Sequence, residues 1–445
     1  MTEKLERALG FKDLTMIVIG TVIGSGIFIV PAIVLRQTGE SVWIALLVWL
    51  LGGILSLLGA LTYGELGAMF PEAGGLYVYL RDAFGPLLGF LYGWSLFFVI
   101  GSGTVATLAV AFSSYLNQLI PLTPFAGRAV SILMIIVVAT INVRGVRTGA
   151  KVQNWTTAIK VVAILVMSAL LIAHGSRFAE GGLRLPSDLF SLKVLSNMGL
   201  AIVGVLWAYE GWHYVSFSTG ETVNPQRIFP RAITLATVAL IGIYLVANVS
   251  YIAALGPSGL AESERPAAQA VSVILGPAAG NLIAVVILIS MFGAANGTTL
   301  TSTRVYFAMA NDGIFFRKLG EVHPRFRTPA LAIIWSSLWA ILMAATGTFE
   351  QLLTYVVFAG WFFYALGAAS VFVFRRTRAA TERPFLVPGY PITPLLFVLA
   401  SFAIVLNTLV SQPERGLVGL GMVLLGTPAY YFWRRRLKGP SASAK

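Results

Sequence analysis

Long apolar runs recur along almost the whole chain, and short polar segments separate them. An α-helix needs roughly 20 residues to cross the hydrocarbon core of a bilayer, so these runs predict membrane-spanning helices. We expect about twelve spans, with ends good to several residues, at 14–36, 42–69, 86–118, 128–143, 152–174, 196–219, 231–255, 274–300, 330–347, 351–374, 391–410 and 416–433. The pattern predicts an all-α integral membrane protein with a single transmembrane domain over 14–434.

Composition and charge agree with this interpretation. The chain is 57% hydrophobic and 11% charged, whereas soluble domains carry about 25% charged residues. Its net charge is +13, and the basic residues gather in short loops such as "RGVRTGAK" (144–151), "RKLGEVHPRFRTP" (317–329) and "RRTRAATERP" (375–384). Because Lys and Arg accumulate in cytoplasmic loops, we expect both termini (1–13 and 435–445) in the cytoplasm. The charge then requires no nucleic acid partner.

Other compositional features narrow the setting. The chain contains no cysteine, so no disulfide can join it to a partner subunit. The start, "MTEKLERALGFKDL", lacks the apolar core of a signal peptide. The longest external segment is expected at 175–195, where "EGGLRLPSD" is typical of turns. We expect a multi-pass protein of the cytoplasmic membrane.

Two of the predicted spans are interrupted. The first carries Gly24-Ser25-Gly26, with Pro31 further on, and the sixth carries "WAYEGWHY" at 207–214. Corresponding interruptions in two halves of a chain indicate an inverted-repeat transporter whose binding site lies at the broken helices. Two repeats of five helices, at 14–174 and 196–374, followed by two helices at 391–434, would account for all the spans.

A helix break at Gly24–Gly26 would expose backbone groups of both polarities. Freed N–H groups at the start of the second half-helix attract an anion, and freed carbonyls at the end of the first attract a cation. Glycine permits close approach to a ligand, and Ser25 adds a hydroxyl donor. A small zwitterion such as an amino acid would satisfy both ends. The alternative is a Gly-x-Gly face that packs against a neighbouring helix.

The second interruption places an acid, Glu210, inside a span, where ionisable residues are expensive and usually functional. Gly211 can open the helix there, and Trp207 is a candidate lid over a bound substrate. Glu210 could instead be a protonated structural residue, and the aromatic residues Trp212 and Tyr214 could simply pack. His213 either takes part in the site or has no role there.

Lys160 lies within the fifth predicted span. A buried ammonium needs partners, and carbonyls of an unwound helix would provide them. Two roles remain open for it: a fixed charge that holds helices together, or a proton carrier. Alternatively, its side chain extends to the cytoplasmic interface.

Five ordered segments together resemble the amino acid–polyamine–organocation superfamily, in particular its bacterial L-type amino acid transporter branch. They are "GSGIF" (24–28), "NVRGVRTGAKVQN" (142–154), "WAYEGW" (207–212), "ETVNP" (221–225) and "RPFLVPGYPITP" (383–394). The resemblance covers nearly the whole chain. It implies the five-plus-five inverted-repeat fold with two added helices, discontinuous helices one and six, and alternating access.

The resemblance also implies site residues. Amides around Ser25, Gly26 and Ile27 would hold the substrate carboxylate, and carbonyls of Val22, Trp207 and Glu210 would hold its ammonium. Trp207 takes the gate position, and Lys160 stands where sodium-coupled relatives bind an ion. Secondary positions are Gly24, Ala208, Gly211, His213, Tyr244, Asn248 and Asn296.

The implied function is sodium-independent exchange or uniport of L-amino acids, with small or medium neutral ones expected. The alternatives within this class are a cationic amino acid or polyamine carrier and a proton-coupled symporter. A membrane enzyme or a channel has little support, because the histidines are scattered and no filter motif is present. We expect no cofactor, no metal and no disulfide-linked heavy-chain subunit.

Overall fold

The computed structural model describes residues 5–177, 191–347, 349–411 and 413–437. Helices are the regular elements of these residues, together with one isolated parallel bridge between Leu9 and Thr222. Most of the expected external segment at 175–195, including "EGGLRLPSD", lies outside the described residues, as does the end of the tail expected at 435–445.

Long apolar helices occupy the predicted spans. Within the described ranges, up to ten segments are long and apolar enough to cross a membrane, if the bent pair at the start is one span. The longer elements are α3 (Val42–Met69), α5 (Pro86–Ser95) continuing through η1 (Leu96–Ile100) into α6 (Gly101–Leu119), α7 (Pro124–Val143), α8 (Val146–His174), α10 (Pro225–Glu262), α12 (Pro277–Asn311) and α14 (Phe349–Thr377). Further apolar helices are α13 (Ala330–Thr346), α15 (Ile392–Ser411), α16 (Pro413–Leu424) and α17 (Gly426–Leu437). The chain is a multi-pass, all-helical membrane protein.

Three short elements lie between the predicted spans: α4 (Leu76–Phe84), α11 (Pro266–Leu275) and η4 (Arg317–Gly320). Hydropathy does not reveal them because they are too short to cross a bilayer. Several long helices also extend beyond the apolar runs, as α10 does from 225 to 262 with a kink at Gly256. Apolar runs mark the hydrocarbon depth, whereas helices continue into the polar region on either side.

The first predicted span consists of two helices. α1 (Phe11–Val22) ends where Ile23 leaves helical geometry (ψ 90°), and α2 (Gly26–Gln37) begins three residues later. The two axes are bent by 45°. Pro31 lies inside α2, where its missing N–H leaves the Ile27 carbonyl without its usual helical donor.

The sixth predicted span is also not one continuous α-helix. α9 (Leu192–Ala208) ends before Glu210, and Gly211 has a left-handed conformation (φ 113°) that favours glycine. The chain then continues as a 3₁₀-helix, η3 (Trp212–Glu221). Runs of 3₁₀-helix this long are uncommon and often mark functional positions.

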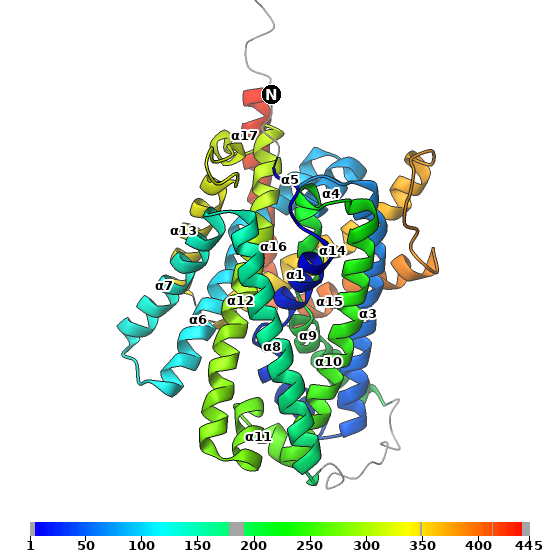
Figure 1. Ribbon diagram of the computed structural model, residues 1–445. Coiled ribbons are helices and arrows are strands. Elements are labelled where there is room, and N and C mark those ends of the chain that lie inside the picture. Colours follow the sequence, from blue (N-terminus) through cyan, green and yellow to red (C-terminus); the bar gives the residue numbers. More distant parts are fainter. Residues whose placement is uncertain (1–4, 178–190, 348, 412, 438–445) are drawn as a thin grey trace, which may run out of the picture.

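α1 lies inside the bundle, where it packs against α8, α10 and α12, while α2 packs against α9 and α10 (Figure 1). The first described residues and the end of α17 lie at the same end of the bundle, at the top of Figure 1. This arrangement surrounds the residues of the first break with neighbouring helices.

Buried ion pairs tie elements together. Arg304 of α12 donates to both carboxylate oxygens of Glu221, at 2.6 and 3.0 Å, and both side chains are fully buried. Glu65 of α3 is likewise buried and accepts from Arg375 at 2.7 and 3.0 Å and from the Val387 amide at 2.8 Å. These bonds explain how the acid Glu65 can lie within a predicted span.

The Arg304–Glu221 pair gives a testable prediction for stability. Arg304→Met leaves a buried carboxylate without its partner, which typically destabilises a protein by about 3–5 kcal/mol. We expect a large fall in the unfolding temperature of the purified protein in detergent. Replacing both groups, as Arg304→Met with Glu221→Gln, is expected to recover most of it.

The matched control is Arg147→Met, which breaks the exposed pair of Arg147 with Glu6 (2.6 Å; 71% and 46% exposed). An exposed pair contributes about 0–1 kcal/mol, so little change is expected. Equal shifts for Arg304→Met and Arg147→Met would contradict the assigned role of the buried pair.

Candidate binding site at the two helix breaks

The two breaks lie against each other. A Cβ atom added at Gly26 would lie 2.6 Å from the Ala208 Cα, and one added at Gly211 would lie 3.2 Å from the Thr21 carbonyl. The Thr21 hydroxyl, which also lies 2.7 Å from the Ile17 carbonyl, lies 3.2 Å from the Gly211 carbonyl. The contact at Gly26 leaves no room for a Cβ atom, and Gly211 has a positive φ that favours glycine. These two glycines therefore allow the two chain segments to come together.

Tyr244 of α10 links the carbonyl ends of both breaks. Its buried hydroxyl lies 3.2 Å from the Val22 oxygen and 2.9 Å from the Ala208 oxygen. Each of these residues is the last of its helix, α1 or α9. A hydroxyl carries one hydrogen, and a carbonyl oxygen has two lone pairs. The Val22 oxygen also accepts from the Gly24 amide at 2.8 Å. The Ala208 carbonyl therefore retains capacity for another donor, and the Val22 carbonyl does so when Tyr244 donates to Ala208.

Lys160 is fully buried and points at the first break. Its ammonium donates to the carbonyls of Gly20 at 2.7 Å, Ile23 at 2.6 Å and Ser290 at 3.3 Å. The Ser290 hydroxyl lies 3.0 Å from both the Ile23 and Gly24 carbonyls. An ammonium has three donors, and three carbonyls receive them. The side chain thus stays inside the bundle and does not extend to the interface.

The amide end of the first break is arranged differently. Ser25 precedes the first turn of α2, whose initial amides, including those of Gly26 and Ile27, have no partner within the helix. The Ser25 hydroxyl is buried and has no hydrogen-bond partner among the described residues. These groups, with the positive end of the helix dipole, can receive an anion.

Glu210 lies at the second break and is 7% exposed. One of its carboxyl oxygens accepts a hydrogen bond from the Tyr364 hydroxyl at 2.6 Å. Trp207, just before it, is partly exposed, and its carbonyl accepts from the Glu210 amide at 3.1 Å. The acid therefore has a protein partner from α14.

His213 is buried among aromatic rings. Its ring centroid lies 4.0 Å from that of Tyr364 and 4.5 Å from that of Tyr214. Neither ring nitrogen has a hydrogen-bond partner among the described residues. Trp212 and Tyr214 are also almost fully buried, so this aromatic cluster packs inside the bundle.

Two of the secondary residues serve helix contacts. The Asn248 amide donates to the Tyr244 carbonyl one turn earlier in its own helix at 2.8 Å. Asn296 accepts from Asn142 at 2.9 Å and donates to Gln153 at 3.0 Å, which joins α12 to α7 and α8. The breaks, in contrast, bring together Val22, Gly24, Ser25, Gly26, Ala208, Gly211, Lys160 and Tyr244.

Ser290 and Tyr364 bond the proposed site residues, although the sequence analysis did not select them. Each is a hydroxyl residue in an otherwise apolar stretch, "ILISMF" and "WFFYAL". Such residues are common in membrane helices, so this signal is weak without the fold. Within the described residues, no group of three or more His, Cys, Asp or Glu could hold a metal ion.

Comparisons with known proteins identify the family to which this chain is similar. Residues 9–424 match the family model described as "Amino acid permease". The serine/threonine exchanger SteT of Bacillus subtilis is 33% identical over 97% of this chain and 98% of its own length. The human b(0,+)-type amino acid transporter 1 is 32% identical over 99% and 92% of the two chains. The human large neutral amino acids transporter small subunit 2 is 32% identical over 98% and 82%.

Substitution of Gly26 tests whether the contact between the breaks supports binding. Gly26→Ala places a methyl group against the Ala208 backbone, and overpacking of this kind costs about 1–3 kcal/mol. We expect about five- to 150-fold weaker binding of the best amino acid ligand, found by a thermal-shift screen of the twenty amino acids and measured by calorimetry.

Gly242→Ala is the matched control, because a Cβ there meets nothing within 4 Å. It is expected to bind the same ligand with unchanged affinity. Wild-type affinity in Gly26→Ala would mean that the close contact of the two breaks does not determine binding.

Proposed function

The chain belongs to the amino acid permease family, and on that premise we propose that it is a sodium-independent exchanger of small or medium neutral L-amino acids. The observation that carries this proposal is the meeting of two helix breaks, with backbone amides and carbonyls at one place. The family moves amino acids across membranes and does not catalyse a chemical reaction. An amino acid offers one charged group to each kind of backbone dipole.

In the proposed architecture, about twelve spans form two inverted repeats, 14–174 and 196–374, followed by two helices at 391–434. The breaks after Val22 and Ala208 fall in the first helix of each repeat. Both described ends of the chain lie at one end of the bundle (Figure 1), which supports an even number of spans. The basic loops favour the cytoplasm for that end.

The proposed site follows the polarity of the breaks. The substrate carboxylate lies against the amides of Ser25, Gly26 and Ile27, with the Ser25 hydroxyl as an additional donor. The ammonium lies against carbonyls of Val22, Trp207 and Glu210. The partly exposed Trp207 ring acts as the gate over the bound molecule.

Lys160 is proposed as a fixed charge. Because its ammonium already has three carbonyl acceptors between α1, the first break and α12, it fills the position where a sodium ion would need the same oxygens. This supports transport that depends on neither sodium nor a proton gradient.

The substrate class is proposed from two observations. The B. subtilis relative is named as a serine/threonine exchanger, and the Glu210 carboxyl group already accepts a hydrogen bond from the Tyr364 hydroxyl. Both favour a neutral side chain over a cationic one. Since the chain has no cysteine, a disulfide-linked partner subunit is not part of the proposal.

Counterflow in liposomes tests the proposed exchange. Purified protein is reconstituted into liposomes loaded with unlabelled L-serine, and uptake of labelled L-serine is measured in sodium or choline buffer at equal pH on both sides. We expect uptake that requires internal serine and is equal in the two buffers. Labelled L-lysine is expected to enter poorly.

Two outcomes would overturn this proposal. Uptake that requires sodium would exclude the sodium-independent mechanism. Strong lysine counterflow that is lost in Glu210→Gln but kept in Tyr364→Phe would favour the cationic alternative. Tyr364→Phe is the control, because it removes the same hydrogen bond but keeps the carboxylate.

The role of Lys160 gives a separate prediction. If its ammonium is a fixed charge, serine counterflow in the wild type proceeds without any pH gradient, and imposing an inward proton gradient changes it little. Lys160→Ala leaves three carbonyls without their donor and is expected to reduce counterflow at every pH tested. A wild type that needs the proton gradient, with that dependence lost in Lys160→Ala, would instead identify a proton carrier.

A further inference from the structure

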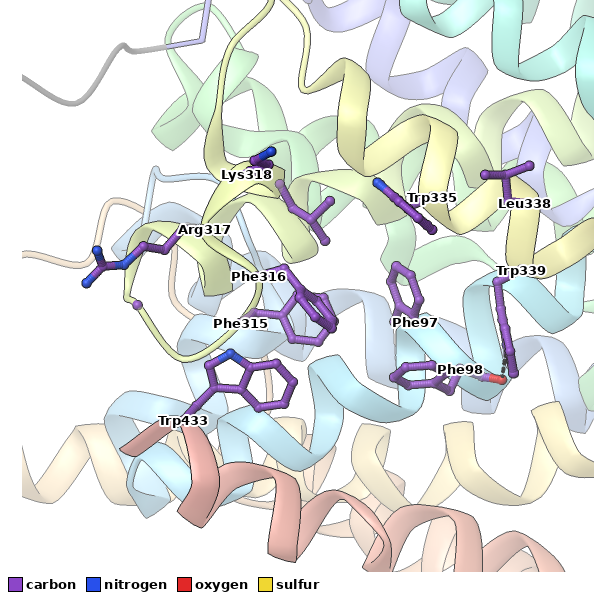
Figure 2. A pocket seen from close by; sticks show the side chains of 12 residues that line it. Phe97, Phe98, Phe315, Phe316, Arg317, Lys318, Trp335, Leu338, Trp339 and Trp433 are labelled. Carbon is purple, nitrogen blue, oxygen red and sulfur yellow. Dashed lines mark hydrogen bonds between the residues drawn. The ribbon is translucent and has the colours of Figure 1, made fainter. Parts of the chain in front are cut away.

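A large groove lies outside the proposed transport site, between η1, α13, α17 and the segment 313–319, which follows α12 and includes most of η4. Its volume is about 940 Å³, and aromatic side chains form most of its wall (Figure 2). Figure 2 shows Phe97, Phe98 and the indoles of Trp335 and Trp339 around one part, and Phe316 with Trp433 around another. Phe316 and Trp335 are 52% and 56% exposed, so the apolar wall is open to the surroundings.

The floor of the groove is held in a fixed shape. Phe97 and Phe98 belong to η1, a π-helical turn, which shifts the usual backbone bonding and is frequent at functional positions. Neighbouring helices supply donors to its carbonyls. The Trp339 indole N–H donates to the Phe98 oxygen at 3.0 Å, and the Tyr306 hydroxyl donates to the Leu96 oxygen at 3.0 Å. The aromatic rings of the floor are thus positioned from three elements.

Positive charge is confined to one part of the groove. Arg317 and Lys318 of η4 line it, and Figure 2 shows both beyond the rings of Phe315 and Phe316. Both are exposed, and no ion pair among the described residues includes either side chain. The residues that line the groove, as far as the structure describes them, include no Asp or Glu. The groove therefore pairs an apolar, aromatic surface with uncompensated positive charge.

We propose that this groove binds an anionic phospholipid of the cytoplasmic leaflet. An acyl chain lies along the aromatic wall, and the phosphate lies against Arg317 and Lys318. Basic residues beside membrane helices attract anionic lipids, and aromatic side chains gather at the level of the headgroups. The assignment rests on the proposed topology, which puts residues 317–329 in the cytoplasm. An amino acid substrate fits the groove less well, since no acid among its described lining residues could receive an ammonium.

Native mass spectrometry of the full-length protein tests the lipid site. The protein is exchanged into detergent with phosphatidylglycerol or with phosphatidylcholine of identical acyl chains, and the fraction that retains one lipid is measured. We expect selective retention of phosphatidylglycerol. A basic residue near an anionic lipid is worth about fivefold in affinity, so Arg317→Gln with Lys318→Gln is expected to weaken phosphatidylglycerol binding about 25-fold.

The control is Lys12→Gln with Lys151→Gln, which removes equal charge from exposed residues elsewhere. It is expected to retain phosphatidylglycerol like the wild type. Equal loss in both double variants, equal retention of the two lipids, or a dimer of the chain in place of a lipid adduct would overturn the proposal. So would displacement of the lipid by millimolar inorganic phosphate, which would indicate an anion site without an acyl-chain groove.

Lipid retention is measured without transport. Failure of this test therefore leaves amino acid exchange untouched, while failure of serine counterflow leaves the lipid result untouched. A second variant, Leu338→Trp, adds bulk to the groove wall and keeps both charges. It is expected to lower phosphatidylglycerol retention, and unchanged retention would contradict an acyl chain in the groove.

Discussion

Peptide groups released from a helix in the middle of a bilayer must find partners, because no water is there to provide them. In this protein, side chains of the protein itself donate hydrogen bonds to most of the carbonyl groups at the two breaks. Lys160 donates to the carbonyls of Gly20 and Ile23. The single hydroxyl hydrogen of Ser290 is within reach of the Ile23 and Gly24 carbonyls, and that of Tyr244 is within reach of the Val22 and Ala208 carbonyls. The amide side has no such built-in acceptor at Ser25, whose hydroxyl has no partner among the described residues. This asymmetry favours a ligand held first by its anionic end.

The need to pair buried polar groups also explains the contacts at the end of η3. Arg304 and Glu221 form a fully buried pair at the end of η3, and the Glu221 carbonyl accepts from the amides of Ala8 and Leu9 at 2.8 and 2.9 Å. The segment before α1 is thus attached to the segment after the second break. Under the proposed alternating access, contacts of this kind would have to separate in another state of the carrier.

The sequence predicted the elements that depend on local composition. The span 42–69 coincides with α3 (Val42–Met69), since a continuous apolar run with polar ends determines it. The sequence also indicated where α1 and α9 would end, because glycines such as Gly24 and Gly211 lower the stability of a continuous helix. The side chains that bond to those breaks were harder to predict from the sequence. Ser290 and Tyr364 act only through helices far away in sequence, and a lone hydroxyl in an apolar run does not distinguish a ligand of the backbone from a packing residue. Short helices such as α4 were missed because they contain too few residues to form a membrane span.

α12 connects the proposed transport site to the aromatic groove. Ser290 lies in its middle and contacts the first break, Tyr306 further along bonds the Leu96 carbonyl of η1, and the groove begins beyond its end at Gly313. Tightly packed interiors transmit strain, so we expect a shift of α12 at the first break to reach the residues near η1. If α12 shifts as the carrier changes state, the groove has different shapes in the two states. A molecule in the groove would then bind the two states unequally and shift their populations, and by the same coupling the transported amino acid would alter affinity at the groove.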